Sequence, residues 1–239
     1  MTDHTVSAFD DELREIGRSV AEIGGLAEQM VERAMSALVR LDAELAQRII
    51  ADDYKVDRLQ HEIEEKAILL IARRQPMARD LREVVAAIRI AADLERVGDL
   101  AKNIAKRVIA LQGQFQPQSL VHGVEHLAEL SLEQLKHVLD AYAGRDTDAA
   151  MAVWRRDEEV DALYTSLFRE LLTYMMEDPR NIGFCTHLLF CAKNIERIGD
   201  HATNIAETVH YQITGVMLTD ERPKRDRTVA PADLPQTDD

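Results

Sequence analysis

Apolar residues recur along most of the chain at alternating spacings of three and four, the period of helices that bury one face. No segment sustains a two-residue alternation, so no strands are predicted. The pattern predicts an all-α protein. In the first such stretch, residues 9–41, the apolar and small positions are Leu13, Ile16, Val20, Ile23, Ala27, Met30, Ala34, Leu38 and Leu41.

Capping aspartates, prolines and glycines divide this pattern into six long helices. Asp42, Asp146 and Asp178 are predicted N-caps, because a short polar side chain can accept the first free N–H groups of a helix. Pro76 and Pro179 are tolerated in first turns, where the backbone N–H has no helical partner. The expected helices cover residues 9–41, 42–74, 76–112, 119–143, 146–177 and 178–215.

A short linker at residues 113–117 separates two halves of three helices each. We expect two domains, each a three-helix bundle, over residues 9–112 and 118–216. Residues 217–239 carry three of the six prolines among charged and small side chains. Such a composition buries too little apolar surface to order itself, so a disordered tail is predicted.

The two halves are repeats of each other. The segment DLERVGDLAKNIA at 93–105 returns 101 positions later as NIERIGDHATNIA at 194–206, with eight of thirteen residues identical. Each copy holds a Glu and an Asp four residues apart, which places both on one face of a helix. Neighbouring carboxylates repel, so a neutralising partner is expected. The two pairs are Glu95 with Asp99 and Glu196 with Asp200.

A further pair of acids, also four residues apart, precedes each of these by about forty residues, across one helix break. Each half therefore contains a helical hairpin. When residues are counted from the turn of each hairpin, the four carboxylates fall at two levels along the helices. These levels are about 6 Å apart, since a helix rises about 1.5 Å per residue. We call Asp53, Asp57, Glu95 and Asp99 the first quartet, and Asp157, Asp161, Glu196 and Asp200 the second quartet.

Each quartet needs protons, Arg or Lys partners, or a bound cation, unless its acids are simply solvated. Arg96 and Arg197 follow the two glutamates about 100° around the helix, so we expect them to point elsewhere. A metal ion is then favoured, with the eight carboxylates as ligands and Asn103 and Asn204 as extensions. Oxygen ligands favour Mg, Mn, Fe or Ca over Zn or Cu.

A glycine lies inside each repeated helix, at Gly98 and Gly199. A glycine in a helix interior costs roughly 1 kcal/mol relative to alanine. Because this cost recurs at matching positions, the glycines predict the close approach of a backbone or a ligand.

Two histidine patterns are weaker. His122 and His126 are four residues apart near Glu129, a spacing that could hold a transition metal, although isolated histidines on a polar helix face are usually solvated. His61 could extend the first quartet, but Thr165 occupies the matching place in the other half.

The formal charge of −14 argues against nucleic acid as a partner and against direct docking on an anionic membrane. The first residues have no basic and apolar leader pattern, and no apolar run approaches the roughly 20 residues that span a bilayer. Cys185 and Cys191 match no zinc or redox spacing and are expected to be buried thiols. A cytoplasmic protein is expected.

The chain resembles the PhoU family. The resemblance covers residues 9–216 and rests on RRQPMARDLR at 73–82, DLERVGD at 93–99, MMEDPRN at 175–181 and CAKNIERIGDHATNIAE at 191–207. It implies two three-helix bundles related by pseudo-symmetry and a homodimer. It also implies metal binding by both quartets, with iron clusters in some members.

The resemblance further implies a regulator without catalytic activity. Such a protein links the ATPase subunit of the Pst phosphate transporter to a PhoR-type sensor histidine kinase and represses the phosphate-starvation response when phosphate is plentiful. Its contact with the membrane would be indirect, through these partners. The roles of phosphate, the transporter and the kinase are implied only by the resemblance, not by the residue pattern itself.

The alternative from another class is a ferritin-like carboxylate-bridged metalloenzyme. Its di-iron site needs a Glu-x-x-His from each of two helices. Gly98 and Gly199 stand where those histidines would be, and Glu207 with His210 form a single such motif. A purely structural coiled coil would leave the matched acids and glycines unexplained.

Overall fold

The computed structural model describes the backbone of residues 2–113 and 118–219 and the side chains of residues 9–113 and 120–219. Most of the predicted linker and tail, residues 114–117 and 220–239, lie outside the described residues. The first half contains α1 (Thr2–Arg40), α2 (Ala43–Asp52), α3 (Tyr54–Arg74) and α4 (Arg79–Ala110). The second contains α5 (Gln118–Gly144), α6 (Thr147–Glu177), the short 3₁₀ helix η1 (Pro179–Asn181) and α7 (Ile182–Thr214).

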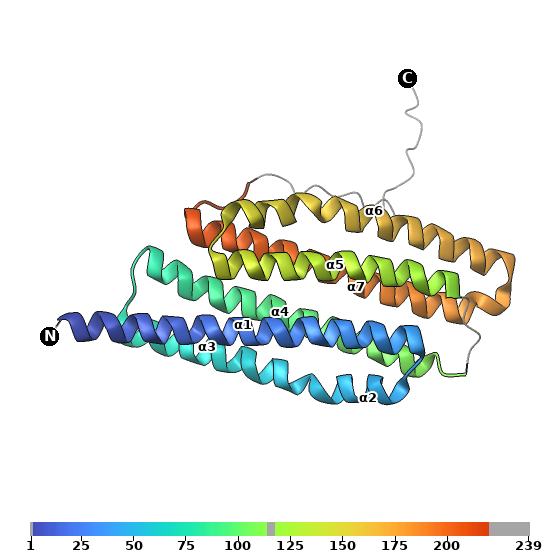
Figure 1. The fold of residues 1–239 in the computed structure, drawn as a ribbon, viewed down its shortest axis with the longest axis horizontal. Coiled ribbons are helices and arrows are strands. Elements are labelled where there is room, and N and C mark those ends of the chain that lie inside the picture. Colours follow the sequence, from blue (N-terminus) through green and yellow to red (C-terminus); the bar gives the residue numbers. More distant parts are fainter. Residues whose placement is uncertain (1, 114–117, 220–239) are drawn as a thin grey trace, which may run out of the picture.

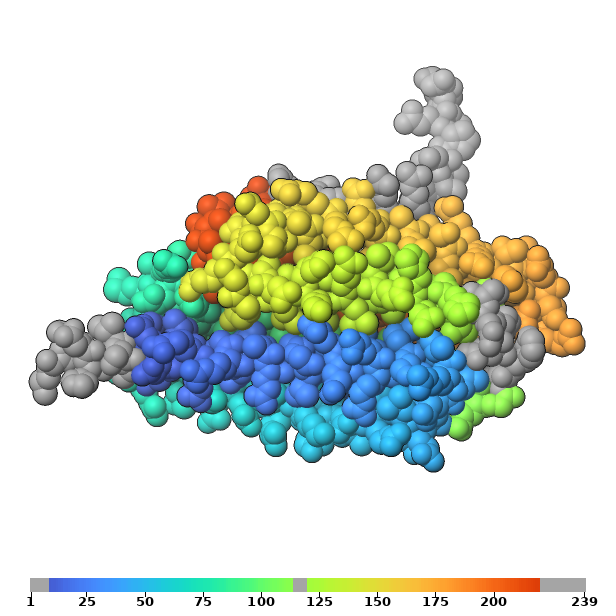
Figure 2. All heavy atoms as spheres, viewed as in Figure 1, coloured from blue at the N-terminus to red at the C-terminus, as the bar shows by residue number. Residues whose placement is uncertain are grey.

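The helices form two bundles that lie side by side with their long axes roughly parallel (Figure 1). In the first bundle α2 and α3 together take the place that α6 takes in the second. The bundles meet where α4 packs against α7 and α1 against α5, and Figure 2 shows α1 and α5 alongside each other on one face. The prediction of an all-α protein with two pseudo-symmetric three-helix bundles is confirmed.

The prediction of a single helix over 42–74 is wrong at Asp53. The structure has two helices there, α2 and α3, which meet at this residue. Asp53 keeps helical backbone angles of φ −52° and ψ −38°. The Val56 N–H donates to the Asp53 carbonyl at 2.9 Å, a three-residue bond that tightens this turn. The apolar spacing could not reveal the interruption because both parts keep the same helical period.

The same turn joins the first and second helices of each half. Leu41 and Arg145 have left-handed φ values of 51° and 54°. The next residues, Asp42 and Asp146, are the predicted N-caps, and each carboxylate accepts the N–H three residues on, at 2.9 and 3.0 Å. Both predicted caps are confirmed.

The reversals inside the two hairpins differ. Gln75 and Ala78 have positive φ values of 49° and 48°, which a helix cannot contain. The third helix therefore begins at Arg79, three residues later than predicted from Pro76. In the second half Asp178 accepts the Arg180 N–H at 2.9 Å, so it caps η1 and not the long helix as predicted. The long helix, α7, begins at Ile182.

One continuous apolar cluster fills both bundles and their junction. Burial raises the pKa of the Cys191 thiol to about 12 despite the nearby charge of Arg107. Cys185 and Cys191 are buried free thiols, as predicted. Among the helices of the described ranges, none combines the length and the apolar character that a bilayer crossing requires.

Candidate functional site

The two glycines lie where the helices that carry the acids are in contact. A Cβ built on Gly98 would lie 3.3 Å from Val56 Cγ1, and one on Gly199 would lie 3.4 Å from Val160 Cγ1. Each valine directly precedes the second acid of its pair. These contacts agree with the hairpin register counted from the sequence, and they give a helix-packing reason for both glycines.

A lysine lies between the two helices of the first quartet. Lys102 Nζ donates to Asp53 Oδ2 at 2.5 Å and to Asp99 Oδ1 at 2.6 Å. The Lys102 side chain is 21% exposed and the Asp53 side chain 8%. An internal cation therefore already bridges the α2–α3 junction and α4 at this place.

Arg96 also joins this group, against the expectation that it would point elsewhere. Its Nη1 lies 3.1 Å from Asp99 Oδ2 and its Nε 3.3 Å from Glu95 Oε2. The Arg96 side chain is 61% exposed, so this pairing is loosely held. The expectation failed because a long, flexible side chain can bend back toward its own helix.

The carboxylates of the first quartet act on one another electrostatically. Burial raises the pKa of Asp57, and the charge of Asp53 raises it further. Burial also raises the pKa of Glu95, with Asp99 adding to the effect. For Lys102, burial opposes the charged form, but its hydrogen bonds to Asp53 and Asp99 prevail and raise its pKa.

The second quartet is more deeply buried. Asp157, Asp161 and Glu196 are 2%, 4% and 5% exposed, so these acids do not form a solvated face. Thr203 Oγ1 donates to Asp157 Oδ1 at 3.1 Å, and Lys193 Nζ donates to Glu196 Oε1 at 2.8 Å. Burial raises the pKa of Glu196 although Lys193 opposes this effect.

Buried oxygen atoms without hydrogen-bond partners lie in the second half. They include Gln134 Oε1, Thr165 Oγ1, Glu196 Oε2 and Gln212 Oε1. Gln134 Oε1 would lie 3.2 Å from a Cβ on Gly199, so it faces the helix that carries Glu196. In the described part of α1–α4, no side-chain oxygen is left in this state.

The donor chemistry of both quartets suits a hard cation, because every candidate ligand is an oxygen. The positions of the side chains do not fit a metal ion. Over residues 9–113 and 120–219, no three His, Cys, Asp or Glu side chains are grouped so that they could hold one. In the second half an ion would supply a partner for Glu196 Oε2. In the first half Lys102 stands between the acids.

The two asparagines do not extend the quartets as expected. Asn204 Nδ2 donates to Asp93 Oδ1 in the other bundle at 3.4 Å. His201 Nδ1 lies 2.8 Å from the same oxygen. Asn103 Oδ1 instead accepts from Lys106 at 3.5 Å. Asp93, His201 and Asn204 thus form a polar contact across the α4–α7 junction.

The histidine pair on α5 is exposed. The His122 and His126 side chains are 70% and 61% exposed and pair with Glu125 and Glu129 at 3.2 and 3.4 Å. These contacts within one helix favour the solvated alternative.

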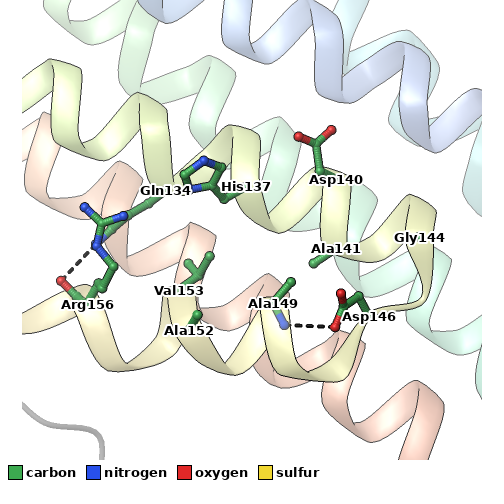
Figure 3. A pocket seen from close by; sticks show the side chains of 10 residues that line it. All are labelled: Gln134, His137, Asp140, Ala141, Gly144, Asp146, Ala149, Ala152, Val153 and Arg156. Carbon is green, nitrogen blue, oxygen red and sulfur yellow. Dashed lines mark hydrogen bonds between the residues drawn. The ribbon is translucent and has the colours of Figure 1, made fainter.

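Two grooves lie apart from the acids. One of about 360 Å³ runs between α5 and α6, with Gln134 at one end, where its Nε2 donates to the Arg156 carbonyl at 3.1 Å (Figure 3). The other, about 680 Å³, lies where the bundles meet and includes Arg14, Arg18 and Arg145. Neither is lined by a carboxylate of a quartet.

Lys102 and Thr203 were not predicted from the sequence. Lys102 follows Asp99 by three residues, a spacing at which side chains on a helix meet. Thr203 follows Asp200 in the same way. Comparing the two repeats at this position would have shown that only the first carries a cation there.

Fold and site together define a class of protein: a duplicated all-α molecule whose paired helical hairpins carry buried acidic motifs at matching places. The PhoU domain model matches this chain twice, over residues 20–108 and 124–209. The chain belongs to the PhoU family.

Relatives and solved structures agree with this assignment. The chain is 64% identical to the phosphate-specific transport system accessory protein PhoU homolog of Rhizobium meliloti, over 94% of this chain and 95% of that one. It is 53% identical to the homolog of Caulobacter vibrioides, over 95% and 98%. The crystal structure of PhoU from Pseudomonas aeruginosa superposes with a TM-score of 0.82 at 37% identity, covering 87% of this chain and all (100%) of that one. The phosphate transport system regulatory protein PhoU from Streptococcus pneumoniae gives 0.81 at 31% identity, over 88% and 99%.

Proposed function

We propose that this protein is an accessory regulator of phosphate uptake that represses the phosphate-starvation response when phosphate is plentiful. The observation that carries the proposal is the 64% identity, over nearly the whole of both chains, to a protein named as an accessory of the phosphate-specific transport system. The two-bundle fold, with a TM-score of 0.82 to a PhoU crystal structure, supports it.

In this proposal the protein works in the cytoplasm as a homodimer. It links the ATPase subunit of a Pst-type phosphate transporter to a PhoR-type sensor histidine kinase, and it reaches the membrane only through these partners. The formal charge of −14 supports protein partners rather than nucleic acid, because phosphate backbones are bound by clustered Lys and Arg.

We also propose that acids of the quartets bind a metal ion, Fe, Mn or Mg. The support is the burial of Asp157, Asp161 and Glu196 and the unpartnered Glu196 Oε2. A bound cation would neutralise the buried carboxylates. Glu196 and Asp200 from α7 would then be held against Asp157 and Asp161 from α6, which would stiffen the hairpin as a docking surface.

The proposal includes no catalysis. The one Glu-x-x-His motif is engaged elsewhere, since Glu207 Oε1 accepts from Trp154 Nε1 at 3.0 Å and His210 Nδ1 lies 3.1 Å from the Val216 carbonyl. We expect the purified, metal-loaded protein to show no oxidase turnover. Metal-dependent oxidation that is lost on Glu196→Gln would favour the carboxylate-bridged metalloenzyme instead.

A deletion strain tests the regulatory function. Cells lacking the protein should express phosphate-starvation genes in abundant phosphate, because the kinase is no longer restrained, and the wild-type gene should restore repression. A reporter of a starvation promoter, read in high and low phosphate, provides the measurement. Unchanged repression in the deletion strain would reject the proposed function.

A further inference from the structure

The larger groove, of about 680 Å³, lies at the end of the molecule where α4 begins and α5 and α7 end (Figure 1). Its walls come from both bundles, because α1 and α4 line it from the first and α5 and α7 from the second. Sites for small ligands commonly enclose roughly 300–1,000 Å³. The groove therefore has room for a molecule with several groups, which is more than a single phosphate or carboxylate needs.

Part of the lining is positively charged. Arg14 and Arg18 are four residues apart on α1, so they share one face of that helix, and both line the groove together with Arg79 of α4. All three residues are exposed. Arg145 also lines the groove, but its fork donates two hydrogen bonds to Glu83, at 3.0 and 2.7 Å. Three arginines are thus left to meet a ligand.

The local charge favours an anion. Two further acids, Asp10 and Asp80, line the groove, so three arginines stand beside two aspartates once the Arg145–Glu83 pair is set aside. The formal charge of the whole chain is −14, which makes this excess of positive charge a local feature. The first turn of α4 adds to it, because Ala78 at its N-cap has no side chain that accepts the free N–H groups.

A buried amide in the lining lacks a partner. Gln212 lines the groove from the last turn of α7 and is only 3% exposed. Its Oε1 accepts no hydrogen bond from the described residues. A buried acceptor without a donor is unfavourable, so this oxygen requires a bound N–H or O–H group. The groove therefore combines a cationic part with an acceptor that needs a donor.

The rest of the lining suits a flat, apolar body. Phe9 and Leu13 of α1 and Leu139 and Tyr142 of α5 belong to it. Burial, and then the charge of Glu83, raises the pKa of Tyr142 to about 12, so this side chain is neutral at physiological pH. Aromatic and leucine side chains pack well against a planar ring.

We propose that this groove binds a nucleoside phosphate. The phosphate groups contact Arg14, Arg18 and Arg79, because guanidinium forks match phosphate oxygens. The base packs against the apolar lining and donates an N–H group to Gln212 Oε1. Inorganic phosphate would satisfy the arginines but leave the apolar lining and most of the groove unfilled. This inference depends neither on the proposed regulation nor on metal binding.

The test is calorimetric titration of the full-length protein with ATP and with GTP, in a chelator so that no metal ion mediates binding. One nucleotide should bind per chain, and added salt should weaken binding, since exposed charges are screened. Adenosine, guanosine and inorganic triphosphate should each bind at least about tenfold more weakly than the better nucleotide, because each lacks one part of the contacts.

Two variants separate the two parts of the site. Arg18→Ala with Arg79→Ala should weaken the binding of nucleotide and of inorganic triphosphate alike, by about tenfold or more, because charge-assisted hydrogen bonds are lost. Gln212→Leu should weaken nucleotide binding and leave triphosphate binding unchanged. Arg48→Ala with Arg58→Ala is the control, because it removes the same charge from exposed positions outside the groove.

Four outcomes would overturn the inference. Neither nucleotide binds up to millimolar concentration, inorganic triphosphate binds as tightly as both nucleotides, the control pair weakens binding as much as the groove pair, or a folded Gln212→Leu variant binds nucleotide normally. Circular dichroism of each variant reports whether it is folded. Arg18 and Arg79 are exposed, so the arginine pair and the triphosphate comparison decide the question even if Gln212→Leu fails to fold.

Discussion

At the scale of single residues, the sequence predicted the acids and glycines but not their partners. The four-residue spacing of Glu95 and Asp99 follows directly from helical geometry, and its repetition made chance an unattractive explanation. Lys102 was not recognised because many lysines on a helix lie three residues from an acid. Only the neighbouring helix, which brings Asp53 to the same place, distinguishes it from a surface charge.

Gly98 provides a test of the helix contact. Gly98→Val should lower the free energy of unfolding by about 2 kcal/mol, since the added methyls would enter space occupied by Val56 and overpacking costs about 1–3 kcal/mol. Gly25→Ala is the control, because a Cβ there meets nothing within 4 Å. The control should stabilise the helix by up to about 1 kcal/mol. Urea unfolding followed by circular dichroism measures both, and equal changes of the same sign would contradict the packing explanation.

At the scale of the helices, the apolar pattern predicted their existence and order, but not the geometry of their ends. The start of α4 was misplaced because positive φ values at Gln75 and Ala78 leave no trace in an apolar period, and neither residue is glycine. The caps at Asp42 and Asp146 were predictable because a short side chain placed just before a helix has a direct chemical reason. The expectation for Arg96 failed because helical angles fix the Cβ direction but not the reach of a long side chain.

A pH test applies to the contact between α1 and α5. Burial raises the pKa of Glu28 from its ordinary 4.5, and Lys136 partly opposes this shift. The folded protein therefore holds the Glu28 proton more tightly than the unfolded chain does. The resulting penalty is absent at pH values below 4.5 and grows as the pH rises through the raised pKa of Glu28.

Glu28→Gln mimics the protonated carboxyl and should raise the melting temperature at pH 7. The gain should vanish near pH 4, where the wild-type side chain has taken up its proton. Glu22→Gln, an exposed position on the same helix, should show no such trend. Scanning calorimetry at the two pH values provides the measurement. A variant less stable than wild type at pH 7 would show that the pairing with Lys136 outweighs burial.

At the scale of the whole molecule, the duplication predicted two bundles but not how they meet. The apolar periods specify that each helix buries a face, and α4 and α7 bury theirs against each other as well as within their own bundles. The polar contact at this junction was not predictable from the repeat, because Asp93 corresponds to Asn194 and His201 to Leu100. It exists once in the described molecule rather than twice.

The junction contact can be tested against its own repeat. Asp93→Ala should lower the free energy of unfolding by about 1–2 kcal/mol, because it leaves His201 and Asn204 without their shared carboxylate. Asn194→Ala, at the matching position, loses one exposed bond to the Phe190 carbonyl and should cost less. Chemical unfolding of both variants measures the difference. If Asn194→Ala lowered the free energy of unfolding as much as Asp93→Ala or more, the contact of Asp93 would not stabilise the junction.

The lysine between Asp53 and Asp99 also gives the molecule a direction. A duplicated protein with identical halves would offer a partner two equivalent orientations, and a binding event could not distinguish one end from the other. With an ammonium bound to two acids in one bundle and a neutral hydroxyl at the matching place in the other, rotation about the pseudo-twofold axis does not restore the same charges. A partner that senses this difference can dock in one orientation only.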